Sequence, residues 1–134
     1  MIHKIEEVRV YCGPAALMAV TGKRLPEVRA VVNNLRGRAP NQGIIGMTQG
    51  EIDHSLEALG VKFNTRSIGP NPPTLRAFIE TLKADVPVII NVTGHFVTYY
   101  KDVIIDNHYR FGTSIDECKW ARKKVKAYWV IKSA

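Results

Sequence analysis

The 134-residue sequence predicts an α+β domain, in which N-terminal helices pack on a C-terminal antiparallel β-sheet. Helical patterns come first along the chain, and most strand patterns follow in the second half. Residues 86–92 are β-branched and nearly continuous, as in a central strand. Lys101 and Asp102 then form a two-residue connection, which fits a tight hairpin between two further strands.

Start and stop signals place the helices. Pro14 suits a first helical turn, where a missing N–H costs nothing, and Gly22 stops that helix. Thr48 and Glu51 have the spacing of a capping box at the start of another helix. The expected helices cover residues 13–20, 26–35, 48–60 and 74–82, with a weaker helical pattern at 114–123. The expected strands cover residues 61–66, 86–92, 95–100, 103–106 and 125–132.

Size and composition limit the kind of protein. Residues 1–134 fit one domain, and 46% hydrophobic with 23% charged residues is usual for a globular protein. The apolar runs are too short to cross a membrane, and the N-terminus lacks the apolar region of a secretory signal. Only two cysteines are present, without metal-type spacing, which favours a reducing compartment and predicts no metal or other cofactor. Cys118 is expected to be a passive thiol that is not bonded to Cys12.

The chain is basic, with a net charge of +7. Five of the cations lie within residues 119–126, a run that could contact nucleic acid or an acidic partner. A solvated helix end or strand edge is the preferred interpretation of this run. Trp120, Tyr128 and Trp129 could stack on bases beside it, but packing in the core is their expected role.

Cys12 is the first candidate for chemistry. A thiol is a nucleophile only as its thiolate, and the positive end of a helix dipole lowers the pKa of a thiol. The helix expected to follow Cys12 places the sulfur at that end, beside small residues that leave it open to a substrate. A buried structural cysteine is the alternative, and the local sequence does not decide between the two.

His95 supplies a candidate base. It starts a predicted strand directly after Gly94, where a missing side chain would let another element approach closely. The next strand should run back antiparallel and bring Asp106 near His95, where a carboxylate would hold the imidazole in one tautomer and stabilise the imidazolium. A structural core histidine is the alternative for His95 taken alone.

Three segments of the chain resemble the papain-like cysteine peptidase superfamily. They are residues 11–22, the Leu-x-x-Leu-Gly pattern at 56–60, and residues 94–97 taken with 103–107. The nearest likeness is to short, often phage-encoded peptidases, and a more distant one is to the leader peptidases of bacteriocin exporters. The resemblance implies a papain-like fold and a peptide or protein substrate, in the cytoplasm of a bacterium or phage-infected cell or in a virion.

The same resemblance implies the roles of the site residues. Cys12 would be the nucleophile, His95 the general base and then acid, and Asp106 the orienting residue. Asn107 competes with Asp106, because some of these enzymes use Asn and because strand neighbours face opposite sides, so only one can reach His95. Aliphatic residues ending in Asp favour Asp106. His108 could replace His95 as the base, but it lacks a preceding Gly.

One position departs from the family pattern. Many of these enzymes carry a Gln six residues before the nucleophile, whose amide donates to the oxyanion, and Glu6 stands there in this chain. An ionised carboxylate would repel the developing charge. Either the oxyanion hole uses the backbone N–H of Cys12 with another donor, for which Gln42, Gln49 and Asn91 are the available amides, or the activity has been lost.

The sequence therefore leaves two hypotheses of function. The first is a thiol hydrolase that cleaves a peptide or isopeptide bond, although the same triad also supports amidase, transglutaminase and acyltransferase chemistry. The second is a catalytically inactive protein of the same fold, which acts as a binding or virion-associated protein with a basic surface.

Overall fold

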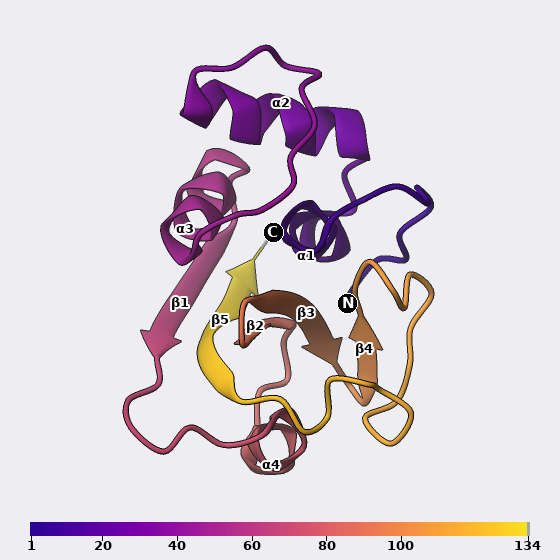
Figure 1. Ribbon diagram of the computed structural model, residues 1–134, viewed down its shortest axis with the longest axis vertical. Coiled ribbons are helices and arrows are strands. Elements are labelled where there is room, and N and C mark those ends of the chain that lie inside the picture. Colours follow the sequence, from indigo (N-terminus) through magenta and orange to yellow (C-terminus); the bar gives the residue numbers. More distant parts are fainter. Residues whose placement is uncertain (134) are drawn as a thin grey trace.

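A five-stranded antiparallel sheet organises residues 1–133, the part of the chain that the computed structural model describes (Figure 1). The strand order is β1-β5-β2-β3-β4, and the described residues also form four helices, so the fold is mixed α and β. The helices are α1 (Cys12–Thr21), α2 (Leu25–Arg36), α3 (Gln49–Ala58) and α4 (Leu75–Thr81). The strands are β1 (Lys62–Ser67), β2 (Val88–Val92), β3 (His95–Tyr100), β4 (Val103–Ile105) and β5 (Val125–Ser133).

The helix ends follow the predicted signals. Gly22 ends α1 in the left-handed conformation, with φ of 73°, and its N–H donates to the carbonyl of Met18. The capping box of α3 is complete, because Thr48 Oγ1 accepts from the N–H of Glu51 at 3.1 Å and Glu51 Oε1 accepts from the N–H of Thr48 at 3.0 Å. Thr74 caps α4 with its side chain. Local sequence signals thus fix where these helices begin or end.

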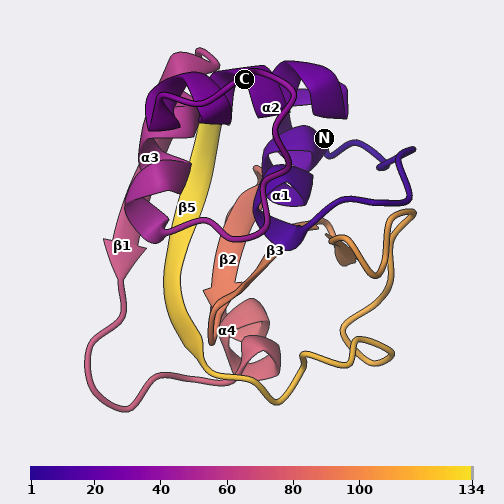
Figure 2. The ribbon, with the colours of Figure 1, turned by 45° about the horizontal axis from the view of Figure 1, so that its top comes forward.

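The two faces of the sheet bury separate apolar clusters. Helices α1, α2 and α3 cover one face, where Phe96 and Trp129 pack, whereas α4 and the turns before β5 cover the other, where Val97 and Cys118 lie (Figures 1 and 2). Strand side chains alternate between the two clusters, as the pleat requires. The central strand β2 is buried throughout, as its sequence predicts.

Two-residue hairpin turns flank β3. Thr93 and Gly94 have φ of 52° and 82°, and Lys101 and Asp102 have φ of 44° and 67°. Positive φ at both central residues is the conformation that matches the twist of a two-stranded hairpin. The expected close approach at Gly94 is wrong, because a Cβ there would meet nothing within 4 Å. Gly94 instead serves the turn by adopting positive φ without strain.

Residues 114–123 form successive turns and not the helix that their pattern predicts. The hydroxyl of Tyr109 accepts from the N–H of Lys119 at 3.0 Å and donates to the carbonyl of Glu117 at 3.4 Å. The backbone groups that a helix would pair internally are therefore bonded to a side chain from another segment. A distant contact overrides the local propensity here.

The basic run 119–126 crosses these turns and enters β5, and its five cationic side chains are exposed. Trp129 is fully buried against Phe96, and the ring of Tyr128 packs on Phe78, so both residues lie in the core as expected. Trp120 has a different place, described below. Within residues 1–133, none of the helices combines the length and apolar character that crossing a bilayer would need.

Glu51 joins the cap of α3 to α2, and its removal should destabilise the protein. Its carboxylate accepts from Arg36 Nε at 2.6 Å and Nη2 at 3.0 Å, in addition to the cap. Glu51→Ala should lower the free energy of unfolding in urea by about 1–2 kcal/mol, since a cap and a partly exposed ion pair are lost together. Glu57→Ala, at an exposed position of the same helix, is the control and should cost less than about 0.5 kcal/mol. Equal losses would show that the cap contributes nothing.

Candidate active site

Cys12 is the first residue of α1, as the sequence predicts for a nucleophile at a helix start. Tyr11 precedes it in extended conformation and provides no side-chain cap, and the first turn holds no acidic residue. The positive end of the helix is therefore not neutralised by a carboxylate of its own. A Cβ on Gly13 would meet the sulfur of Met47 at 2.7 Å, so the absence of a side chain lets Met47 pack against the backbone that follows Cys12.

The environment of Cys12 favours the thiolate. Burial alone would raise the pKa of the thiol, but hydrogen bonding by the His95 side chain and by the backbone N–H of Phe96 lowers the pKa below its usual value. The charge of the imidazole and the N–H of Gly13 act in the same direction. Cys12, at the start of α1, and His95, the first residue of β3, therefore lie close enough for each to shift the pKa of the other.

Strand geometry leaves the backbone N–H of Phe96 free to donate to the Cys12 thiol. Val92 and His95 flank the two-residue turn as a hydrogen-bonded pair, so the N–H of Phe96 points away from β2. The strand on its other side, β4, ends at Ile105, opposite Thr98, and does not reach Phe96. The short β4 therefore leaves a backbone donor for the thiol at the edge of the sheet.

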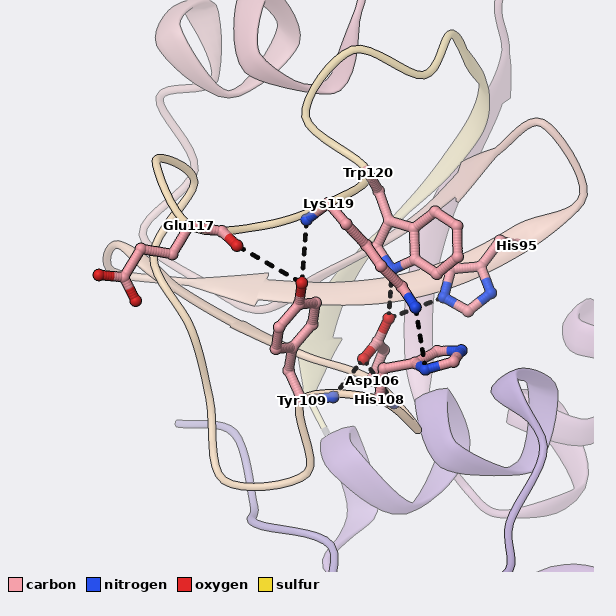
Figure 3. Close-up of polar contacts among 7 residues, drawn as sticks. All are labelled: His95, Asp106, His108, Tyr109, Glu117, Lys119 and Trp120. Carbon is pink, nitrogen blue, oxygen red and sulfur yellow. Dashed lines mark hydrogen bonds and ion pairs between the residues drawn. The ribbon is translucent and has the colours of Figure 1, made fainter.

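His95 lies between the thiol and a carboxylate. Its Nε2 is 2.7 Å from Asp106 Oδ2 (Figure 3). This bond leaves Nδ1 as the ring nitrogen that can face Cys12. Burial would lower the pKa of His95, but the hydrogen bonds to Asp106 and Cys12 raise it from 6.5 to about 9. An imidazolium beside a thiolate is the charge state that these opposite shifts favour.

Asp106 is the carboxylate that reaches His95. Its side chain is fully buried and also accepts from Trp120 Nε1 at 2.7 Å and from the backbone N–H groups of His108 and Tyr109 at 2.9 and 2.7 Å. Burial would raise the pKa of Asp106, but the hydrogen bonds from His95, the backbone of Tyr109 and Trp120 hold it below the usual value. The carboxylate is thus ionised and saturated with donors.

The pleat explains why Asp106 and not Asn107 has this position. Asp106 lies two residues after Ile104 and therefore on the same side of the sheet. Ile104 packs in one cluster with Val97, which lies two residues after His95. Asp106 and His95 thus share a side of the sheet. Asn107 falls on the opposite side, and its Oδ1 is buried without a hydrogen-bond partner within residues 1–133.

Trp120 is a member of the site that sequence reasoning assigned to the core. Its ring lies 4.2 Å from the His95 ring between centroids, at 33°, while its indole N–H bonds Asp106. Trp120 therefore covers the His95–Asp106 bond from the side of the turns (Figure 3). No local pattern could have found it, because fourteen residues and several irregular turns separate Trp120 from Asp106.

Glu6 does not lie beside the nucleophile. It is exposed and lines a pocket with Gly22 and Arg24, which follow the C-terminal end of α1. Ten helical residues, about 15 Å, separate that end from Cys12. The expectation that the Glu6 carboxylate would repel charge at the thiol is therefore wrong, because the N-terminal segment carries it to the other end of the helix.

The three amides proposed for the oxyanion hole lie in different places. Asn91 is buried in β2, directly across from Phe96, and its Oδ1 accepts from the N–H of Gly94 at 2.9 Å. Gln42 is exposed in the loop before α3, and Gln49 is the first residue of that helix. Of the three, Asn91 lies on the strand next to the residue that contacts the thiol.

The second cysteine is a separate, free thiol, whereas the His108 ring lies 6.0 Å from the His95 ring between centroids. Cys118 is buried and, like Cys12, forms no disulfide, and burial raises the pKa of its thiol. Within residues 1–133 no group of three or more His, Cys, Asp or Glu side chains could hold a metal ion.

No protein-family model matches this chain, and no curated protein matches it either. Its function is therefore inferred from the geometry around Cys12.

The contact between Cys12 and His95 predicts a distinctive pH dependence of stability. His95 has a folded pKa above its unfolded value of 6.5, so alone it would lose stability as the pH rises from 6.5 towards 9. Cys12 has a folded pKa below its unfolded value of 9.0, so alone it gains stability over the same range. In the wild type the two effects oppose each other. Cys12→Ser removes the gain and also the part of the His95 loss that the thiolate causes, so only the shift due to Asp106 remains.

The difference in unfolding free energy, wild type minus Cys12→Ser, should therefore grow as the pH rises from 6.5 and level off at the raised pKa that Asp106 alone gives His95. The slope should approach about 1.4 kcal/mol per pH unit, the value for one proton. Urea titrations at several pH values measure it, with Cys118→Ser as the control, which should follow the wild type until the free thiol itself titrates. A constant difference for Cys12→Ser would mean that the Cys12 pKa is not lowered by folding.

Proposed function

We propose that the chain is a thiol-dependent hydrolase with a papain-like fold, which cleaves a peptide or isopeptide bond through an acyl-enzyme on Cys12. The arrangement of Cys12, His95 and Asp106 carries this proposal: a thiol at a helix N-terminus lies near an imidazole that shifts its pKa, and that imidazole is bonded to a buried carboxylate. The order of a helix-borne Cys followed by an antiparallel sheet that carries His supports the papain-like assignment.

The reaction would proceed in two stages. The Cys12 thiolate attacks the carbonyl carbon, and a C–S bond forms as the carbonyl becomes an oxyanion. When the C–N bond breaks, His95 gives its Nδ1 proton to the leaving amine. Water then attacks the thioester and passes a proton to His95, so that release of the carboxylic acid restores the thiolate and the imidazolium. Asp106 keeps Nδ1 directed at the sulfur throughout.

The oxyanion would be held at the start of α1. The backbone N–H of Cys12 has no acceptor among the described residues, since a helix leaves its first N–H groups unpaired. Asn91 is the amide best placed to be a second donor, because it lies beside Phe96 and its Oδ1 is already bonded, which leaves the NH₂ group as the free part. Removal of one such donor typically costs about 100-fold in turnover or more.

The second candidate function is binding without turnover. The exposed cations of residues 119–126 favour it, since they could hold an acidic partner independently of Cys12. The binding hypothesis predicts that Cys12 reacts no faster than a free thiol. It also leaves the hydrogen-bonded His95–Asp106 pair without a role. Other acceptors than water, as in transglutaminase or acyltransferase chemistry, would use the same acyl-enzyme.

Alkylation of Cys12 separates these functions. Iodoacetamide should react with Cys12 quickly at pH 6, where a free thiol of pKa about 8.5 is almost wholly protonated. His95→Ala should slow this reaction at least about tenfold, Asp106→Ala less so, and Asn107→Ala little, because only the first removes the partner of the thiolate.

Mass spectrometry of tryptic peptides measures the rate at each cysteine. Cys118→Ser is the control and should leave the Cys12 rate unchanged, since Cys118 is buried with a raised pKa. If Cys12 reacts at pH 6 only as slowly as a free thiol, and His95→Ala changes nothing, the hydrolase proposal is wrong and the binding function replaces it.

A further inference from the structure

A lysine and a histidine, Lys119 and His108, form a pair beside the proposed catalytic histidine and have no part in the mechanism above. Lys119 Nζ lies 3.2 Å from His108 Nδ1, and the His108 and His95 rings are 6.0 Å apart between centroids (Figure 3). Lys119 Nζ also lies 4.8 Å from the centre of the Trp120 ring, which itself packs on His95. The charge of Lys119 is therefore held close to the reacting groups.

The pair is positioned by the same contacts that build the site. The backbone N–H of His108 donates to Asp106 Oδ1, and the backbone N–H of Lys119 donates to the hydroxyl of Tyr109. An exposed lysine normally samples many rotamers, but the bond to His108 and the aromatic face of Trp120 restrict this one. Both side chains remain exposed to a ligand.

Acidic groups near the pair do not neutralise it. Asp106 is fully buried and already bonded to four donors. Asp116 is paired with Arg76 at 2.8 Å, and Figure 3 shows the Glu117 carboxylate pointing away from His108 and Lys119. Within residues 1–133, Lys119 forms no ion pair, so its charge is available to an anion from solution.

We propose that His108 and Lys119 form a subsite for a substrate carboxylate on the leaving-group side of the scissile bond. This inference rests on the hydrolase proposal, because His95 gives its proton to the leaving amine and the His108 ring lies 6.0 Å from the His95 ring between centroids. The carboxylate is an acidic side chain or a free C-terminus next to the cleaved bond. Trp120 supplies the apolar wall of the subsite, and Lys119 supplies the charge.

A pair of small alkylating agents tests the charge of the subsite without requiring turnover. Iodoacetate carries a carboxylate and iodoacetamide does not, so the ratio of their rate constants at Cys12 reports the local field. The ratio of the iodoacetate to the iodoacetamide rate constant should fall at least about threefold in Lys119→Gln and further in Lys119→Glu. High salt should lower the wild-type ratio towards that of Lys119→Gln, because it screens the charge of Lys119. Lys123→Gln, at an exposed position of the same basic run, is the matched control and should keep the wild-type ratio.

Peptide amides then identify the source of the carboxylate. One series has Asp, Asn or Lys after the scissile bond with an amidated C-terminus, and a second has a neutral residue with a free or amidated C-terminus. Wild-type kcat/KM should favour the carboxylate in one series, and Lys119→Glu should shift the preference towards Lys.

The outcomes distinguish the two proposals. Rapid reaction of Cys12 with iodoacetamide, combined with an iodoacetate ratio that Lys119→Gln does not change, overturns the subsite and leaves the hydrolase intact. An unreactive Cys12 overturns the hydrolase and the subsite with it. A lowered ratio in Lys119→Gln together with equal cleavage of all the peptides also overturns the subsite, since the charge is then felt without selecting a substrate.

Discussion

The carboxylate of Asp106 is the group on which the rest of the site depends. It is fully buried, and an ionised carboxylate is tolerated away from water only when donors replace its hydration. Four donors do so here, from the start of β3, from the loop that follows β4, and from the turns before β5. Segments with few contacts of their own are thereby fixed relative to one another, and the ring of His95 is fixed with them.

The same carboxylate shapes the edge of the sheet. For Asp106 to accept from the backbone N–H groups of His108 and Tyr109, the chain must turn immediately after Ile105, which ends β4 after three residues. Because β4 stops there, the N–H of Phe96 has no strand partner and can donate to the thiol of Cys12. One buried charge thus orients the imidazole of His95 and leaves a backbone donor for the thiol of Cys12.

The parts of this structure that the sequence predicts are those with local causes. Thr48 and Glu51 cap α3 as their spacing indicates, and the two-residue turns around β3 follow from short loops between β-branched runs. The juxtaposition of His95 and Asp106 also follows from a short hairpin, once the pleat decides which neighbour faces the ring. The approach of Cys12 is less local, since α1 and β3 are far apart in the sequence.

The errors arise where distant residues compete with local preference. Tyr109 captures the backbone of residues 117–119 and prevents the helix that their pattern suggests. Trp120 joins the site through that irregular segment, so its role could not be read from spacing. Glu6 was expected beside Cys12 by counting residues, but the N-terminal segment carries it past the other end of α1.

The charge state of His95 tests the central claim most directly, because every step proposed for Cys12 requires an imidazolium beside a thiolate. Nitrogen-15 NMR of histidine-labelled protein reports the protonation of both ring nitrogens as a function of pH. The wild type should show both nitrogens protonated at pH 7.5, with a pKa of about 9, and Cys12→Ser should lower that pKa because the thiolate is gone. A neutral His95 ring at pH 7.5, with a pKa near 6.5 in both proteins, would contradict the account.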